Sequence, residues 1–358
     1  MRIAMIAHTD APWTPRYSRW LLAHGHEVRV FSFCPDQIDG VDTVFVGRLP
    51  YAPLKDKKPF ILHVGKVRKL LKAYGPDVVF APYLISNGLC ASLAWSGKLV
   101  VSARGSDVLR PKGTMQLASG VRGVLVRWIT HRAKHVHAVS QPLREALIAE
   151  GVPSEKISVF PIGVDTAKFP LADVPDAPTP HFVCTRRHAP VYRNHIIVEA
   201  LAALRDRGHG FTMTFVGGGY LLEERRSQIS ALGLDDCVTC TGFVPHEEIR
   251  ANVARADVYI SASRSDGTSS SLMEALATGP LPVISDIVAN RPWIEAGETG
   301  LFFPVDDVVA LTDALERAVS DEALRMAARE RNRTTALERA DEGKNMTALE
   351  RMLSEAAR

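Results

Sequence analysis

The feature that most constrains this chain is an alternation of short apolar runs with helical patterns. In the first half, composition and length predict strands at 3–7, 28–33, 78–81, 99–102 and 135–139. Helical patterns lie between them, at 16–24, 59–74 and 144–150. Strands separated by helices favour a parallel sheet covered on both faces. The first half therefore predicts a Rossmann-like α/β domain.

The same alternation restarts after a proline-rich segment, 170–181, with four prolines in twelve residues. No helix or central strand accepts that density of proline, so the segment is predicted to be a linker. Strands are then expected at 181–185, 212–216, 238–241, 258–261 and 281–285, with helices at 196–206 and 221–232. From about Asp307 the chain is predicted to be helical throughout.

A length of 358 residues exceeds what one hydrophobic core usually organises. We expect a first domain over 1–170, a linker over 171–181 and a second Rossmann-like domain over 182–335. A last helix, 336–358, is expected to pack back toward the first domain. In open sheets of this kind, ligands bind beyond the carboxyl ends of the strands, so the loops after each strand are the candidate sites.

Charge divides unevenly between the halves. Residues 1–170 carry 23 Lys and Arg against 12 Asp and Glu, whereas the remainder carries 20 against 28. A basic first half suits an anionic partner, such as a membrane surface or a phosphorylated acceptor. The alternative is that opposite charges help two domains face each other, and composition alone leaves both readings open.

Five cysteines, an odd number scattered along the chain, do not resemble a disulfide framework. The pair Cys237 and Cys240 has no second Cys/His pair at zinc-finger spacing, and we expect no metal there. No apolar run reaches the length of a spanning helix, and the first apolar run is too short for a signal peptide. A cytoplasmic location follows as an expectation.

A loop of small residues in the second half is the strongest candidate for an anion site. It is Gly267, Thr268, Ser269, Ser270 and Ser271, followed by Leu272 at the start of a predicted helix. The unpaired N–H groups and dipole of a helix N-terminus favour a phosphate. Asp266 precedes the loop and Glu274 lies one turn inside the helix, so each carboxylate could accept from vicinal sugar hydroxyls. The alternative is a serine-rich cap on an ordinary helix.

Two other loops of the second half could meet the same ligand. Arg186 and Arg193 follow a strand and precede a helix, where they could neutralise a diphosphate without metal. The glycines beginning with Gly217 and Gly218 would let backbone approach a ligand closely. Solvated arginines and a tight turn are the ordinary explanations of these two segments.

Together these segments resemble the retaining glycosyltransferases of family 4, which have the GT-B fold. The resemblance runs from about Ala133 to Leu324 and rests on many short matches in the right order, at 139–143, 160–165, 217–220, 241–246, 256–258, 266–279 and 300–304. It implies two Rossmann-like domains whose parallel sheets face a central cleft. It also implies a donor site that includes Phe243 and Val244.

The resemblance assigns roles to particular residues. The family motif is Glu, seven residues, Glu, and this chain has Asp266 at the first position and Glu274 at the second. Asp266 would contact the transferred sugar and Glu274 the ribose. Arg186 falls at the family's phosphate-binding arginine, and Arg193 is the nearest candidate for its usual lysine.

In the first domain the family commonly carries His-Gly-x-Asp facing the donor. Here the segment runs from Arg104 to Asp107, so a permanent cation replaces an imidazole that can be neutral. The loop after the first strand lacks the paired glycines usual in the family; its His8, Asp10 and Trp13 could shape an acceptor site or form a capped turn. It also lacks G-x-G-x-x-G, which counts against a nicotinamide dehydrogenase.

Basic residues gather on one predicted helix of the first half. Lys55, Lys57 and Lys58 precede it, and its basic face carries Lys66, Arg68, Lys69 and Lys72. An amphipathic basic helix can lie on an anionic leaflet. The favoured alternative is a core-facing helix with a solvated basic face; a second cationic stretch, 122–135, adds some weight to the membrane.

The sequence therefore predicts a hexosyltransferase that moves a sugar with retention from a nucleotide sugar, UDP-sugar rather than GDP-sugar, to a hydroxyl of a glycan, glycolipid or small molecule. No D-x-D occurs in the chain, so no metal or other cofactor is expected. No nucleic-acid partner is expected, and peripheral membrane contact through the basic first domain stands as an alternative to a solvated basic face. A GT-B nucleotide-sugar epimerase and a non-catalytic nucleotide-sugar binder remain as alternatives.

Overall fold

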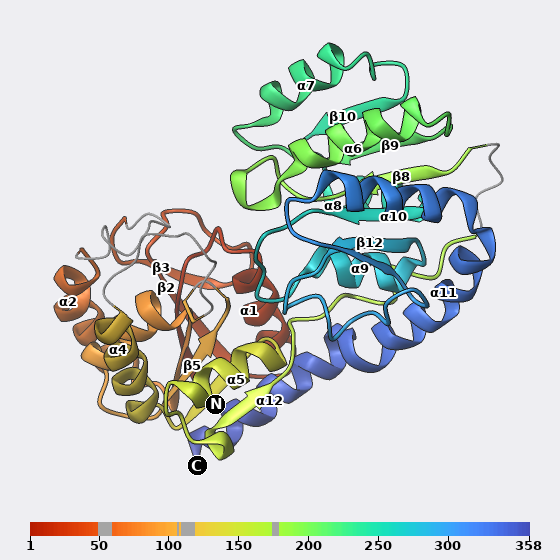
Figure 1. The fold of residues 1–358 in the computed structure, drawn as a ribbon. Coiled ribbons are helices and arrows are strands. Elements are labelled where there is room, and N and C mark those ends of the chain that lie inside the picture. Colours follow the sequence, from red (N-terminus) through yellow and green to blue (C-terminus); the bar gives the residue numbers. More distant parts are fainter. Residues whose placement is uncertain (49–58, 106, 109–118, 174–178) are drawn as a thin grey trace. The chain divides into compact units, whose positions relative to one another are not determined.

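The computed structural model describes residues 1–48, 59–105, 107–108, 119–173 and 179–358. They form two compact units, one made of Met1–Ile162 and Gly343–Arg358 and the other of Gly163–Glu342 (Figure 1). Lys55, Lys57, Lys58 and Ser106 lie outside the described residues. The two units are taken in turn.

The first unit contains a parallel sheet of seven strands in the order β3-β2-β1-β4-β5-β6-β7. The strands are β1 (Arg2–Ala7), β2 (Glu27–Ser32), β3 (Asp42–Phe45), β4 (Val78–Pro82), β5 (Leu99–Ala103), β6 (His135–Ala138) and β7 (Ile157–Val159). Its helices are α1 (Trp13–Ala23), α2 (Pro59–Tyr74), α3 (Leu89–Ala94), α4 (Ser119–Arg132), α5 (Gln141–Ala149) and α12 (Glu342–Ala357). The strand order reverses between β1 and β4, which makes their carboxyl ends the switch point of this sheet.

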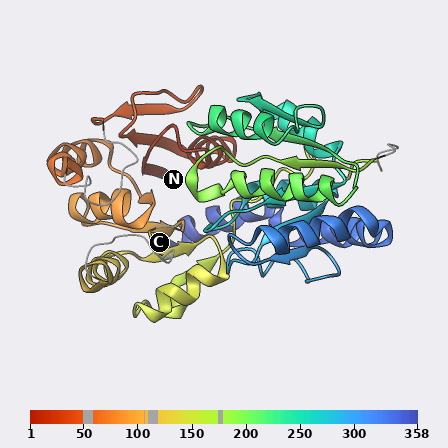
Figure 2. The ribbon, with the colours of Figure 1, turned by 45° about the horizontal axis from the view of Figure 1, so that its top comes forward.

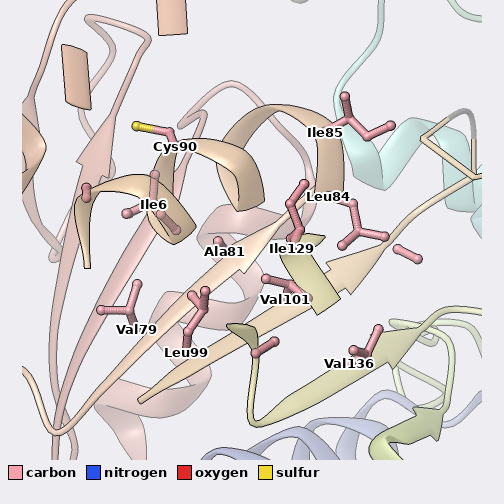
Figure 3. Close-up of a cluster of buried hydrophobic side chains, with 14 of the residues drawn as sticks. Ile6, Val79, Ala81, Leu84, Ile85, Cys90, Leu99, Val101, Ile129 and Val136 are labelled. Atoms are coloured by element: carbon pink, nitrogen blue, oxygen red, sulfur yellow. The ribbon is translucent and has the colours of Figure 1, made fainter. Parts of the chain in front are cut away.

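Alternation along the strands fills both faces of this sheet. Ala4 and Ile6 of β1 face a core that includes side chains of α2, α3, α4 and α5 (Figure 3). Ile3 and Met5 face a second core, which α1 and α12 cover. Successive side chains of a strand point to opposite faces, so one apolar run supplies both cores.

The second unit contains a parallel sheet of six strands in the order β10-β9-β8-β11-β12-β13. The strands are β8 (His181–Cys184), β9 (Thr212–Val216), β10 (Val238–Gly242), β11 (Val258–Ser261), β12 (Leu281–Ser285) and β13 (Leu301–Phe303). Its helices are α6 (Asn194–Asp206), α7 (Leu222–Ala231), α8 (His246–Ala254), α9 (Ser270–Thr278), α10 (Val308–Ser320) and α11 (Glu322–Thr335), as Figures 1 and 2 show. Here the switch point lies between β8 and β11, where Arg186 and the 266–271 loop follow the strands.

The chain passes between the units at different residues from those expected. The sequence placed the end of the first domain at 170 and the linker at 171–181, but the second unit begins at Gly163, and residues 174–178 lie outside those described. The two crossing segments are tied to each other, since the Val164 N–H donates to Ala340 O (2.7 Å) and the Glu342 N–H to Val164 O (2.9 Å). This backbone pairing gives residues 163–170 to the second unit.

The last helix of the chain lies in the first unit. Met346, Leu349 and Leu353 of α12 are buried in the same core as β1, and His26 Nε2 lies 2.9 Å from Glu350 Oε1. The C-terminal region is helical as expected, but it is interrupted at Asp321, the N-cap of α11, and again at Asp341. The short strands β3, β7 and β13 were not anticipated from the sequence.

Candidate functional site

Arg186 organises the loops at the switch point of the second sheet. Its Nη1 donates to Ser269 Oγ (3.0 Å) and Ser271 Oγ (2.9 Å), and its Nη2 donates to the Asp266 carboxylate. Burial alone would lower the pKa of Arg186, but the charge of Asp266 outweighs burial and raises that pKa above its ordinary value. The structure therefore brings together three of the residues that the sequence singled out around one buried, permanent cation.

Two tyrosines, Tyr192 and Tyr259, also contact this cluster. The Arg186 guanidinium carbon lies 4.2 Å from the centre of the Tyr192 ring, and the buried Tyr259 hydroxyl donates to Ser271 Oγ (2.9 Å). A cation over an aromatic face is attracted by the ring quadrupole. Tyr192 and Tyr259 were not among the expected site residues, because nothing in their local sequence distinguishes them from core aromatics.

The helix α9 begins where the anion loop was expected. Ser269 is its N-cap, with Oγ accepting from the Leu272 N–H at 3.2 Å. The first N–H groups of a helix have no partner within it, so this end presents donors and the positive end of a dipole. The serine-rich segment is thus both a cap and a place suited to an anion.

Glu274 lies on the next turn of α9 and is mostly buried. Its Oε1 is 3.3 Å from His246 Nε2, at the start of α8, and the His246 ring meets Phe169 edge-on at 5.5 Å between ring centres. The Glu274 side chain is 14% exposed, against 59% for His246. A ligand hydroxyl reaching Glu274 would therefore meet His246 as well, a residue that was not among the expected site residues.

The glycine turn after β9 is joined to the arginine loop. The His188 N–H donates to Gly218 O (2.9 Å), and a Cβ at Gly219 would lie 2.3 Å from His188 O. Gly217, with a φ of 136°, donates its N–H to Gly242 O (3.0 Å), which brings the turn to β10 and to the exposed ring of Phe243. Val244 is half-buried beside it. Glycine is needed here for close backbone approach between the two loops.

His188 itself is a buried residue that sequence reasoning missed. Burial first, and then the charges of Arg225 and Arg226, lower its pKa to about 4, so the imidazole is neutral at pH 7. Its Nδ1 lies 3.3 Å from Asn194 Nδ2. His188 thus links the arginine loop to the first turn of α6, and no local motif signals that role.

Arg193 has a different partner from Arg186. It adopts a left-handed conformation (φ 52°), and its Nε donates to Asp306 Oδ1 (2.5 Å), while Arg264 Nε donates to Asp306 Oδ2 (2.7 Å). Burial alone would raise the pKa of Asp306, but the hydrogen bonds and charges of Arg264 and Arg193 lower it below the usual range. The Asp306 carboxylate therefore holds two arginines from two loops. Asp306 was not among the residues that the sequence singled out.

In the first unit, the structure brings Arg104, Asp107 and Trp13 together at the carboxyl ends of the strands. The buried Asp107 carboxylate accepts from the backbone N–H groups of Arg104 (3.0 Å), Gly105 (2.8 Å) and Leu84 (3.0 Å). The Arg104 guanidinium carbon lies 4.2 Å from the centre of the Trp13 ring. Asp107 thus fixes the loop that carries Arg104.

His8 and Asp10 occupy contrasting places in the loop after β1. His8 is buried, its ring centre is 5.7 Å from that of Phe33, and its backbone oxygen accepts from the Thr14 hydroxyl (2.7 Å). Asp10 is exposed. The loop is therefore a hydrogen-bonded turn leading into α1, and it presents Trp13 on the first turn of that helix.

Comparison with known proteins matches both units. The profile of the glycosyl transferases group 1 matches residues 174–335, and that of Glycosyltransferase Family 4 matches residues 16–168. A GDP-mannose-dependent alpha-(1-6)-phosphatidylinositol monomannoside mannosyltransferase of Mycolicibacterium smegmatis is 30% identical over 279 residues, which is 72% of this chain and 71% of the relative. The chain belongs to glycosyltransferase family 4. The resemblance read from the sequence is confirmed.

Another relative matches the chain over a shorter length. The amylovoran biosynthesis glycosyltransferase AmsK of Erwinia amylovora is 32% identical over 194 residues, 52% of this chain and 47% of the relative. The alignment therefore spans about half of that relative.

The fold of this family 4 chain is that of solved GT-B glycosyltransferases. HepE of Anabaena, in complex with UDP, superposes with a TM-score of 0.77 at 19% identity, over 99% of this chain and 100% of that one. The predicted pair of Rossmann-like domains with parallel sheets is confirmed.

Within the described ranges, no group of three or more His, Cys, Asp or Glu side chains is placed to hold a metal ion. Among the helices that the structure describes, none combines the length and apolar character needed to cross a membrane.

Proposed function

We propose that this chain is a retaining glycosyltransferase that moves a hexose from a nucleoside diphosphate sugar to a hydroxyl group, without a metal ion. The observation that carries the proposal is the cluster of Arg186, Asp266, Ser269 and Ser271 at the N-terminus of α9. A diphosphate seated there would take hydrogen bonds from Arg186, the serine hydroxyls and the helix N–H groups. Negative charge that develops on the departing nucleotide would be stabilised by the same groups.

Asp266 would act on the sugar rather than on the phosphate. In the ligand-free protein its carboxylate is bonded to Arg186. A diphosphate would compete for that arginine and free the carboxylate to accept from sugar hydroxyls. Glu274, which accepts several hydrogen bonds at once when ionised, would take the ribose hydroxyls. In the transfer itself, the bond from the anomeric carbon to the acceptor oxygen forms as its bond to the diphosphate breaks, on the same face of the sugar, and the proton of the acceptor hydroxyl passes to the departing diphosphate oxygen.

The proposed donor is a UDP-sugar. The support is HepE, which shares the fold over the full length and has been solved with UDP. A GDP-sugar is the second candidate, favoured by the mannosyltransferase relative, whose name specifies GDP-mannose. The proposed acceptor is a hydroxyl of a glycan or glycolipid, in keeping with the amylovoran and the phosphatidylinositol monomannoside that appear in the relatives' names.

Isothermal titration of the purified chain with UDP and with GDP, in EDTA and then in magnesium, tests the donor site. We expect UDP to bind with the same affinity in both buffers, and Glu274→Ala to weaken binding about tenfold or more because it removes a charged acceptor. Glu322→Ala, at an exposed position of α11, is the matched control. Binding of neither nucleotide would contradict the proposal. Tighter binding of GDP would assign the donor to the second candidate.

Product analysis then separates the transferase from the two alternatives. Incubation with a UDP-sugar and hydroxyl acceptors should release UDP with transfer of the sugar. An intact nucleotide carrying a different sugar would indicate an epimerase instead. Binding with neither transfer nor hydrolysis would indicate a non-catalytic binder.

We also propose peripheral contact with an anionic membrane through α2 and α4. Leu62 is 81% exposed on α2, and Val124 (56%) and Trp128 (38%) are exposed on α4. Two members of the basic face of α2 have partners within the fold, since Lys66 Nζ donates to Val46 O (2.5 Å) and Arg68 Nη2 to Leu93 O (2.7 Å). The proposal therefore rests on Lys69, Lys72 and the exposed apolar side chains.

Sedimentation with phosphatidylcholine vesicles, with and without phosphatidylglycerol, tests this contact. We expect the chain to sediment with the anionic vesicles alone, and Leu62→Glu to reduce the bound fraction. Equal sedimentation with both kinds of vesicle, or none with either, would contradict the contact.

A further inference from the structure

The switch point of the first sheet carries a cluster that we call the Arg104 cluster: Trp13, Tyr17, Tyr83, Arg104 and Asp107. Trp13 and Tyr17 lie on the first two turns of α1, after β1, whereas Tyr83 follows β4 and Arg104 follows β5. All five residues belong to the first unit. The cluster therefore stands where ligands bind in open parallel sheets.

The guanidinium of Arg104 is held by aromatic rings. Its central carbon lies 4.2 Å from the centre of the Trp13 ring and 5.8 Å from that of Tyr17, and Nη1 donates to Tyr17 Oη at 2.7 Å. Tyr17 is 1% exposed and packs edge-on against Phe80, at 5.6 Å between ring centres. The buried Tyr17 ring thus fixes the position of the Arg104 guanidinium, which is not free to move in solvent.

The charge of Arg104 is not matched by a side-chain ion pair among the described residues. The nearest acid in its loop, Asp107, directs its oxygens to three backbone N–H groups. A guanidinium has five N–H donors, and the hydrogen bond to Tyr17 engages Nη1 alone. The buried His137 is neutral, since burial, opposed by its hydrogen bond to Phe160 O and assisted by the charge of Arg104, lowers its pKa to about 3. The remaining donors are available to an anion from outside the fold.

Backbone strain marks the same place. Tyr83 has a φ of 80°, in a region that side chains other than glycine rarely adopt. Its ring stacks on Trp13, with 6.1 Å between centres and an angle of 23° between planes. Strain of this kind persists where the surrounding structure requires it and is concentrated at functional sites. The strained residue thus places its ring against Trp13, the residue on which the Arg104 guanidinium rests.

From this geometry we infer that Arg104 determines specificity for a carboxylate carried by a sugar. A fixed, planar guanidinium matches the two oxygens of a carboxylate, and aromatic faces suit the apolar side of a pyranose ring. One cation next to the acidic Asp107 suits a monoanion better than a phosphate dianion. The inference rests on the proposed function, and the carboxylate belongs either to the donor, as a uronic acid, or to the acceptor.

Titration of the full chain in two arms tests the inference. The donor arm compares UDP-glucuronate with UDP-glucose, and the acceptor arm, at saturating UDP, compares a glucuronate-containing disaccharide with its neutral counterpart. We expect one arm to show about tenfold or greater preference for the carboxylated ligand, since charge-assisted hydrogen bonds are the strong ones. Arg104→Gln should abolish the preference, and Arg104→Lys should retain part of it, because it keeps the charge and loses the planar fork.

Arg132→Gln, on the exposed last turn of α4, is the matched control and should keep the full preference. The melting temperature of each variant separates a folding defect from a binding defect, and Arg104→Lys keeps the test valid if Arg104→Gln does not fold. Wild-type protein that binds UDP but shows no carboxylate preference in either arm would overturn the inference and leave the proposed function standing. A preference that survives in Arg104→Gln would also overturn it. Failure to bind UDP or GDP at all would overturn the proposed function, and this inference with it.

Discussion

The two sheets of this chain reverse their strand order at comparable places, and the side chains gathered there differ in kind. In the second unit, Arg186 is bonded to Asp266 and to two serines at the start of α9. In the first unit, Arg104 is held by Trp13 and Tyr17 and has no carboxylate partner among the described residues. A cation paired inside a hydroxyl-lined loop suits a diphosphate, whereas an unpaired cation on aromatic rings suits a sugar with a single negative charge.

The two cations also differ in the residues that hold them in place. Arg186 is held by the side chains of Asp266, Ser269 and Ser271, which would also contact the ligand. Arg104 instead depends on Asp107, whose carboxylate accepts from backbone and is buried. Loss of Arg186 should therefore reduce catalysis, whereas loss of Asp107 should reduce the stability of the first unit.

The largest expected effect is that of Arg186→Gln. Removal of a donor that stabilises charge in the transition state commonly costs about 10² to 10³ in rate, and this arginine also compensates Asp266. We expect kcat for transfer from the nucleotide sugar to fall by about that factor. Arg187→Gln is the control, because Arg187 is exposed and its guanidinium carbon lies 6.0 Å from the centre of the Phe243 ring. If Arg186→Gln kept a kcat within tenfold of wild type, Arg186 would not stabilise charge in the transition state, and the contrast with Arg104 would be contradicted.

The next effect is on stability in the first unit. Asp107→Asn replaces one acceptor oxygen with an N–H₂ group that faces backbone donors, so at least one buried N–H loses its partner. We expect the free energy of unfolding of this unit to fall by about 2 kcal/mol. Urea denaturation measures it, with Asp39→Asn, at an exposed position, as the control. A change below about 0.5 kcal/mol would show that Asp107 does not support the Arg104 loop in this way.

The smallest expected effect is that of Asp306→Asn in the second unit, about 1 kcal/mol of unfolding free energy. The pKa of Asp306 is lowered in the folded protein, so its contribution is complete above the ordinary aspartate pKa of about 3.9 and is lost as pH falls through the lowered value. The difference between wild type and variant should be constant from about pH 5 to 8 and should close in more acidic solution.

The control for this variant is Asp286→Asn, which breaks a more exposed pair with Arg291. Urea denaturation at several pH values, with the control alongside, provides the measurement. If the difference between wild type and Asp306→Asn widens on acidification, the carboxylate does not act through Arg193 and Arg264.

Much of the donor site was readable from sequence because its residues are contiguous. Asp266, Ser269, Ser271 and Glu274 lie on one strand-loop-helix segment, so their order alone places them at the start of α9. Arg186 was found because it follows a strand. Asp306 was not found, since its partners Arg193 and Arg264 are distant in the chain. His188 and Tyr259 were not found either, because a histidine in a loop and a tyrosine in a strand have ordinary local explanations.

The sequence by itself determined the two Rossmann-like units, the positions of their longer strands and helices, and the family to which the chain belongs. Those properties depend on local pattern and on contiguous motifs, which are fixed along the chain. Only the tertiary structure decided that Arg193 pairs with Asp306, that Arg104 rests on Trp13 and Tyr17, and that the second unit begins at Gly163. Each of these depends on contacts between residues far apart in sequence, and strand order and loop conformation set those contacts.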